Sequence, residues 1–180
     1  SVNGPEVTRI QGAGPEGIDA IRGAWLSGGA RLEGFTIGGG ATRLTGTFPF
    51  DRNGGGVYLT GGASISNCVL KGNAGYEGGA AYIHTSGWIN NSVIESNAAS
   101  ANGGGVRMSD VSSGGVRHSR IVRNTAPTAG GVHIYHKGRL QNSLIADNTA
   151  SSSAGGVYVD WGSQGAYIEN CTIAGNQAPL

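Results

Sequence analysis

The chain has 180 residues, the length of one ordinary domain, and its 35 glycines are more than twice the usual share. Five prolines and no G-X-Y period exclude collagen, and a charged fraction of only 13% argues against a disordered chain. A net charge of +1 gives no electrostatic reason to expect nucleic acid or an anionic membrane as a partner.

The sequence begins at Ser1 and shows neither an initiator methionine nor a signal peptide. We therefore expect a mature form or an excised piece. No apolar run approaches the roughly 18 residues of a spanning helix, and we expect no membrane insertion. Residues 1–19 read as a partial first coil, because Val7–Ile10 resembles the end of a later repeat.

The repeat becomes clear from residue 25 onward, where WLSGGARL at 25–32 matches YLTGGASI at 58–65. Later copies open with glycine at positions 78, 103, 130 and 155, each followed by a short apolar strand. A long gap between Ile37 and Leu70 predicts an inserted, protruding loop at residues 41–52.

Each unit closes with an aliphatic residue, two variable residues and an asparagine. The closing asparagines are spaced 24, 27, 24 and 28 residues apart and are Asn73, Asn97, Asn124, Asn148 and Asn176. The closing aliphatic residues form one series, Ile10, Ile37, Leu70, Ile94, Ile121, Ile145 and Ile173. A near-constant period of this length indicates stacked units rather than one globular core.

Within a unit, apolar and polar residues alternate, which predicts strands. Three short strands in about 25 residues, with glycine and asparagine at the corners, leave no room for a helix. We therefore predict an all-β fold, a right-handed single-stranded parallel β-helix of about six coils that forms a single domain over residues 1–180.

Two lanes of asparagine are expected to mark the corners as structural ladders. Asparagine tolerates left-handed backbone geometry, and its amide can bond to the copies above and below. One lane is the closing series, and the other comprises Asn67, Asn91, Asn142 and Asn170, with His118 at the remaining place. We interpret His118 as a stacked polar corner rather than a catalytic residue.

The glycine-rich opening and the aliphatic-x-x-Asn close resemble the GGAI/FxxN repeats of chlamydial polymorphic membrane proteins. They are also similar to glycine-rich right-handed β-helix repeats of the pectin-lyase-like superfamily. The resemblance covers about residues 20–176, although aliphatic residues replace the phenylalanine of FxxN. It implies a secreted or cell-surface bacterial protein, with adhesion more typical than catalysis.

Some β-helix families cleave polysaccharides and need converging carboxylates for this. The acids here scatter, and the best pair, Asp110 with Asp160, lies two coils apart. His84, His133 and His136 have no partners at ligand spacing. We therefore expect no enzyme, no metal and no cofactor, and keep a polysaccharide lyase or hydrolase as the less favoured alternative.

The two cysteines, Cys68 and Cys171, occupy the same place in coils four apart, which is too far for a disulfide between them. Serines fill the places between them, so we expect small buried residues in an inner stack. An intermolecular disulfide is the alternative.

The outward side of the first strand is expected to form an interaction strip exposed to solvent. Its residues are Trp25, Tyr58, Tyr82, Arg107, His133, Tyr135 and Tyr158. Such a strip fits a glycan-stacking platform, a protein contact or a plain cross-strand ladder of aromatic residues, and the sequence leaves all three open.

Neither end of the repeat carries an amphipathic cap, so we expect uncapped ends. A cut from a longer solenoid, head-to-tail stacking into a filament and capping by loops are the alternatives. We hypothesise a non-catalytic structural protein that self-associates head to tail or forms a surface stalk, with a glycan-binding module as the alternative.

Overall fold

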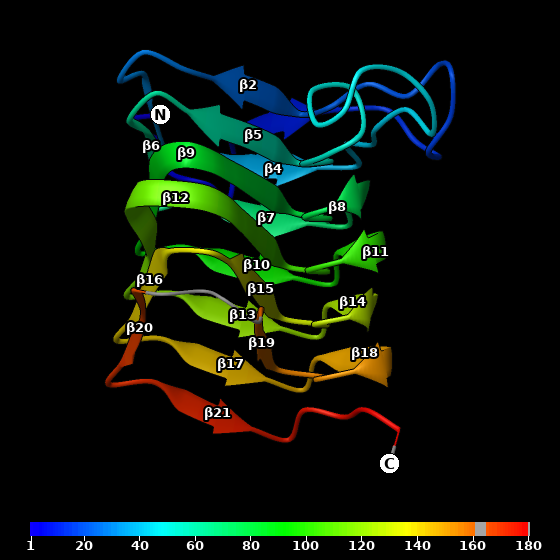
Figure 1. The fold of residues 1–180 in the computed structure, drawn as a ribbon. Coiled ribbons are helices and arrows are strands. Elements are labelled where there is room, and N and C mark those ends of the chain that lie inside the picture. The colour runs from blue at the N-terminus through cyan, green and yellow to red at the C-terminus, as the bar shows by residue number, and fades with distance from the viewer. Residues whose placement is uncertain (161–164, 180) are drawn as a thin grey trace.

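The computed structural model describes residues 1–160 and 165–179. The described part is a stack of coils in which every strand pair is parallel, and no helix interrupts it. Figure 1 shows the coils following one another from the N-terminal end to the C-terminal end, with equivalent strands beside each other. This confirms the predicted all-β parallel solenoid.

The third strand of each coil builds a seven-stranded sheet. Its members, in sheet order, are β1 (Arg9–Gln11), β4 (Thr36–Gly38), β7 (Val69–Lys71), β10 (Val93–Glu95), β13 (Arg120–Val122), β17 (Leu144–Ala146) and β21 (Thr172–Ala174). The backbone register places Ile10 beside Ile37 and Ile94 beside Ile121 and Leu70. The series of closing aliphatic residues was therefore predicted in its true register.

The first and second strands of the coils share one sheet. The first strands are β2 (Ala24–Leu26), β5 (Val57–Thr60), β15 (Val132–Tyr135) and β19 (Val157–Val159), and the second strands are β3 (Arg31–Glu33), β6 (Ala63–Ser66), β16 (Gly138–Gln141) and β20 (Ala166–Glu169). In the middle of the stack the two merge into the long strands β9 (Ala81–Asn90) and β12 (Val106–Arg117).

A further strand in each coil was missed by the prediction of three. It follows the closing asparagine and builds a four-stranded sheet of β8 (Ala74–Glu77), β11 (Ala98–Asn102), β14 (Thr125–Thr128) and β18 (Thr149–Ser153). These segments, AGYE, AASAN, TAPT and TASSS, carry mostly small and polar residues instead of alternating large apolar residues. Backbone pairing with the adjacent coils, which no local pattern reveals, makes them strands.

Aliphatic side chains fill the interior from coil to coil. The inner residues of the first strand, Val57 and Leu59, are fully buried, as are Ile94, Ile121 and Ile145 of the third strand. Each buried side chain of this size contributes about 2 kcal/mol to folding. The core is therefore a continuous column and has no single centre.

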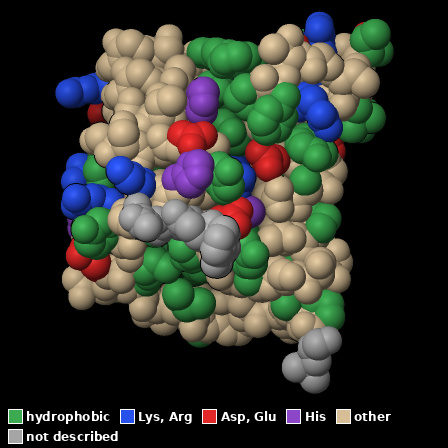
Figure 2. Space-filling model, in the orientation of Figure 1, with side chains coloured by type: hydrophobic (Ala, Val, Ile, Leu, Met, Phe, Trp, Pro, Cys, Tyr) green, Lys and Arg blue, Asp and Glu red, His purple; other side chains and the backbone are tan. Residues whose placement is uncertain are grey.

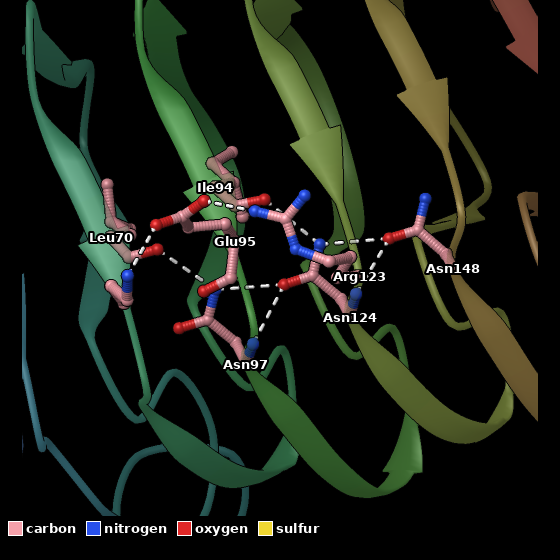
Figure 3. Close-up of polar contacts among 8 residues, drawn as sticks. Leu70, Ile94, Glu95, Asn97, Arg123, Asn124 and Asn148 are labelled. Carbon is pink, nitrogen blue, oxygen red and sulfur yellow. Dashed lines mark hydrogen bonds and ion pairs between the residues drawn. The ribbon is translucent and has the colours of Figure 1, made fainter.

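The closing asparagines form a buried amide ladder, which Figure 3 shows for three successive coils. Asn97 donates from Nδ2 to Oδ1 of Asn124 at 2.9 Å, and Asn124 does the same to Asn148 at 3.0 Å. The same Asn124 amide donates to the carbonyl oxygen of Ile94 at 3.0 Å. Each asparagine thus joins three coils, as the predicted stacking requires.

The other asparagine lane serves a different purpose, because it lies at exposed corners with left-handed backbone. Its φ angles lie between 46° and 51° at Asn67, Asn91, His118, Asn142 and Asn170. His118 keeps this geometry and contacts the Asn142 amide at 3.3 Å, consistent with a stacked corner.

The cysteine lane is an inner stack of small residues. Cys68 is 1% exposed, its backbone N–H donates to the Ser92 hydroxyl, and Ser92 N–H donates to Ser119. Both Cys68 and Cys171 are free, and burial raises the pKa of the Cys68 thiol.

Residues 41–52, between β4 and β5, contain no strand. Phe50 packs on Trp25 with ring centroids 5.9 Å apart, and the Arg22 guanidinium donates to the Phe50 carbonyl at 2.6 Å. Within the described residues, nothing has the length and apolar character of a membrane-crossing helix.

Candidate functional site

The outward residues of the first strand form a lane along the solenoid. The register aligns Trp25 with Tyr58, Tyr58 with Tyr82, and Tyr82 with Arg107. His133 and Tyr158 continue the lane. Six residues of the predicted interaction strip therefore form an aligned row, whereas Tyr135 lies beside it, paired with Ser109.

The expectation that this strip is exposed is wrong for its middle. Tyr58, Tyr82, Arg107 and His133 are 0%, 1%, 7% and 4% exposed, and only Trp25 is open to solvent, at 46%. Tyr135 and Tyr158 are partly buried. An extended glycan or protein therefore meets no continuous aromatic surface at this lane.

Groups from outside the first strand cover the lane: Phe50 packs on Tyr58, and the corner before β9 brings Glu77 beside Arg107. Gly78 has a φ of 65° and turns the end of β8 back toward β9, so a Cβ at Gly78 would lie 2.2 Å from the Ala81 carbonyl oxygen. Glu77 then lies beside the lane and is itself buried. Because this turn depends on the unrecognised fourth strand, alternation within the first strand alone could not predict it.

The N-terminal half of the lane is aromatic. Tyr58 stacks between Trp25 and Tyr82, with ring centroids 4.5 Å and 5.4 Å apart, and Phe50 packs at its side. Burial, followed by the proximity of Tyr82, raises the pKa of the Tyr58 hydroxyl far above its ordinary value. This half is a packed ladder of rings, which corresponds to the structural interpretation of the strip.

The C-terminal half of the lane is charged. Arg107 Nε lies 3.6 Å from Glu77 Oε2, and this carboxylate accepts hydrogen bonds from the amides of Asn53 at 3.2 Å and Asn102 at 2.8 Å. In the following coils His133 Nε2 lies 3.4 Å from Asp160 Oδ2. Polar side chains therefore take the place of the aromatic ladder in this half, and Asp160 at its end is 30% exposed.

His133 is expected to make stability depend on pH. Burial and the neighbouring Arg107 charge lower its pKa from 6.5 to about 4, with Asp160 opposing both effects. The unfolded chain therefore binds one more proton between pH 6.5 and 4, and stability falls as pH drops through this range. Urea unfolding should show a loss of about 2 kcal/mol from this group between pH 7 and pH 5.

Two variants isolate the contribution of His133. His133→Tyr introduces a tyrosine, the residue found at the equivalent positions Tyr82 and Tyr158. It should flatten this pH dependence. His118→Asn, at the exposed corner, should leave it unchanged. An equal pH dependence in wild type and His133→Tyr would show that His133 is not the responsible group.

The carboxylates of the less favoured enzymatic alternative lie on an outer face. Asp110 is paired with His136 Nδ1 of the next coil, and its Oδ2 accepts from the Ser109 hydroxyl at 3.1 Å. Burial opposes ionisation of Asp110, but the hydrogen bonds from His136 and Ser109 hold its pKa below the usual value. Figure 2 shows acidic and histidine side chains next to one another on this face.

Each of these two acids therefore has a histidine partner in a neighbouring coil. Across residues 1–160 and 165–179 no group of three histidine, cysteine or acidic side chains is arranged to hold a metal ion. Asp110 and Asp160 therefore lie in two separate aspartate–histidine contacts.

A second surface feature was missed by the sequence reasoning. Outside the second strand, a cavity of about 450 Å³ is lined by Gly29, Arg31, Glu33, Gly62, Ser64, Ser66, Trp88, Asn90 and Arg117. The sequence signal that could have revealed this cavity is the pair Ser64 and Ser66. Both are small, whereas the equivalent positions in the coils before and after carry long side chains.

The chain matches a known family model. Residues 34–173 match the family model described as right handed beta helix region, which is most of the chain. Searches among curated proteins and among solved structures found no match, so the resemblance to chlamydial polymorphic membrane proteins stays a prediction. With its parallel coils and this match, the chain belongs to the right-handed β-helix family.

Proposed function

We propose that the chain is a non-catalytic structural module, a stiff rod within a secreted or cell-surface bacterial protein. The observation that carries this proposal is the asparagine ladder, which continues from Gly40 N–H through Asn73 to Asn176 without a break. Such a ladder couples each coil to the next in the way that a rod requires. Asp110 and Asp160 contact different histidines, which differs from the facing carboxylate pair that a glycoside hydrolase uses.

The last described coil supports extension by stacking. Ile168 and Ile173 are 42% and 49% exposed, whereas their partners Leu140 and Ile145 in the preceding coil are fully buried. A further coil on this edge, from the same polypeptide or from another copy, would bury both isoleucines and pair their strands. Filaments and stalks both use such stacking.

Electron microscopy and sedimentation of the chain at increasing concentration test the filament form. We expect rods that lengthen with concentration, and rods that stay short in Ile173→Lys. Thr172→Lys, which places the same charge on the neighbouring residue of β21, is the matched control and should lengthen like wild type. Short rods of one length at every concentration would contradict self-stacking and leave the stalk form.

The non-catalytic role needs a separate measurement. The purified chain should not depolymerise neutral or uronate polysaccharides, as followed by reducing ends and by absorbance of unsaturated products. Cleavage that Asp110→Asn or Asp160→Asn abolishes would overturn the proposal in favour of an enzyme.

A further inference from the structure

The cavity outside the second strand results from one coil with short side chains. The register aligns Arg31, Ser64 and Trp88 in three successive coils. Beside them it aligns Glu33, Ser66 and Asn90. The two serines are partly buried, so they form a floor, with long side chains on the coils before and after it.

The walls of this notch are held in place before any ligand arrives. The Arg117 guanidinium lies over the Trp88 ring, 4.8 Å from its centroid, and Arg117 Nε donates to Asn90 Oδ1 at 2.6 Å. On the opposite wall, the Asn67 amide donates to Glu33 Oε1 at 2.6 Å. Preorganised walls reduce the entropy cost of binding.

The width of the notch matches one saturated ring. Arg31 and Trp88 lie two coils apart, a separation of about 9.6 Å at the ordinary strand spacing. Subtracting the half-thickness of an indole and of a guanidinium leaves roughly 6 Å, estimated from van der Waals contact distances. A pyranose fits between the two side chains, whereas a folded peptide element about 10 Å across does not.

The chemistry of the lining suits a sugar. The indole offers an apolar face for ring C–H groups, while the serine hydroxyls, the Asn90 amide and the Arg31 guanidinium offer donors and acceptors for ring hydroxyls. Glu33 adds an acceptor for hydroxyl donors, while Arg31 and Arg117 give the lining a net positive charge. We propose that this notch binds one pyranose unit of a glycan, a function beyond the structural role of the rod.

Binding can be measured by calorimetry and by tryptophan fluorescence with neutral hexaoses of glucose, mannose and galactose, and with hexagalacturonate. At least one of these hexaoses should bind with a dissociation constant below about 1 mM, and added salt should weaken the binding of hexagalacturonate more than that of a neutral hexaose. Trp88→Ala and Ser64→Tyr, which fills the notch and keeps the indole, should each weaken binding at least about tenfold. Trp25→Ala, at the exposed tryptophan of the other lane, should not.

Each contrary result is decisive. No binding by any of these hexaoses, or binding that survives both Trp88→Ala and Ser64→Tyr, would overturn the proposal. Thermal melting of each variant serves as the folding control. We expect the solenoid to stay folded, because Trp88 and Ser64 both lie on the outer face.

Discussion

Ile121→Asp should abolish folding of the solenoid. Ile121 is fully buried, and the register places it between Ile94 and Ile145, which are also fully buried. A carboxylate there would be buried without a counter-ion, or would have to be protonated at a cost of several kcal/mol. The loss approaches the whole stability of a typical domain, which is about 5–15 kcal/mol.

Circular dichroism and urea unfolding measure this effect. Arg120→Asp provides the matched control, because Arg120 is the neighbouring residue on β13 and its side chain is exposed. We expect the control to retain a cooperative transition close to that of wild type. Near-native thermal stability of Ile121→Asp would show that the third-strand column is not the core.

Asn124→Leu should destabilise the chain by about 3–6 kcal/mol, although leucine is apolar and similar in size. The Asn124 Oδ1 atom accepts from the Asn97 backbone N–H at 3.0 Å and from the Asn97 amide at 2.9 Å. Leucine would leave the buried Asn97 backbone N–H without this acceptor and would remove the amide donor from the Ile94 carbonyl group, although the Asn97 amide keeps the carbonyl groups of Leu70 and Glu95. Each buried polar group without a partner costs about 1–3 kcal/mol.

The free energy of unfolding in urea tests this prediction, with Thr125→Leu as control. Thr125 is the next residue and is exposed, so its replacement should change stability by less than about 0.5 kcal/mol. A loss below about 1 kcal/mol in Asn124→Leu would mean that the ladder contributes little beyond its packing.

The sequence was sufficient to predict the architecture and the register of the third strands. Coils repeat the same residue types at the same places, so aligning Ile94, Ile121 and Ile145 in sequence also aligns them in space. The same logic placed both asparagine lanes. The sequence did not show which lane forms the buried amide ladder and which forms the exposed left-handed corners, because both environments favour asparagine.

The predicted strip shows where local pattern fails. Alternation correctly placed Tyr58 and Tyr82 on the side opposite Leu59, but it cannot say what covers that side. The turn at Gly78 and the carboxylate of Glu77 belong to the neighbouring strand. The notch at Trp88 was missed for the same reason, since its walls come from three coils.

The sequence by itself determined the repeat, the strand periodicity and the residues that stack in line, because backbone pairing between equivalent coils makes position in the repeat equal to position in space. Only the tertiary structure decided which outward side chains meet water. That outcome depends on how tightly each corner turns and on the side-chain volumes of adjacent coils. Both depend on contacts between coils that are distant in the sequence, and the spacing of residues within one repeat does not reveal such contacts.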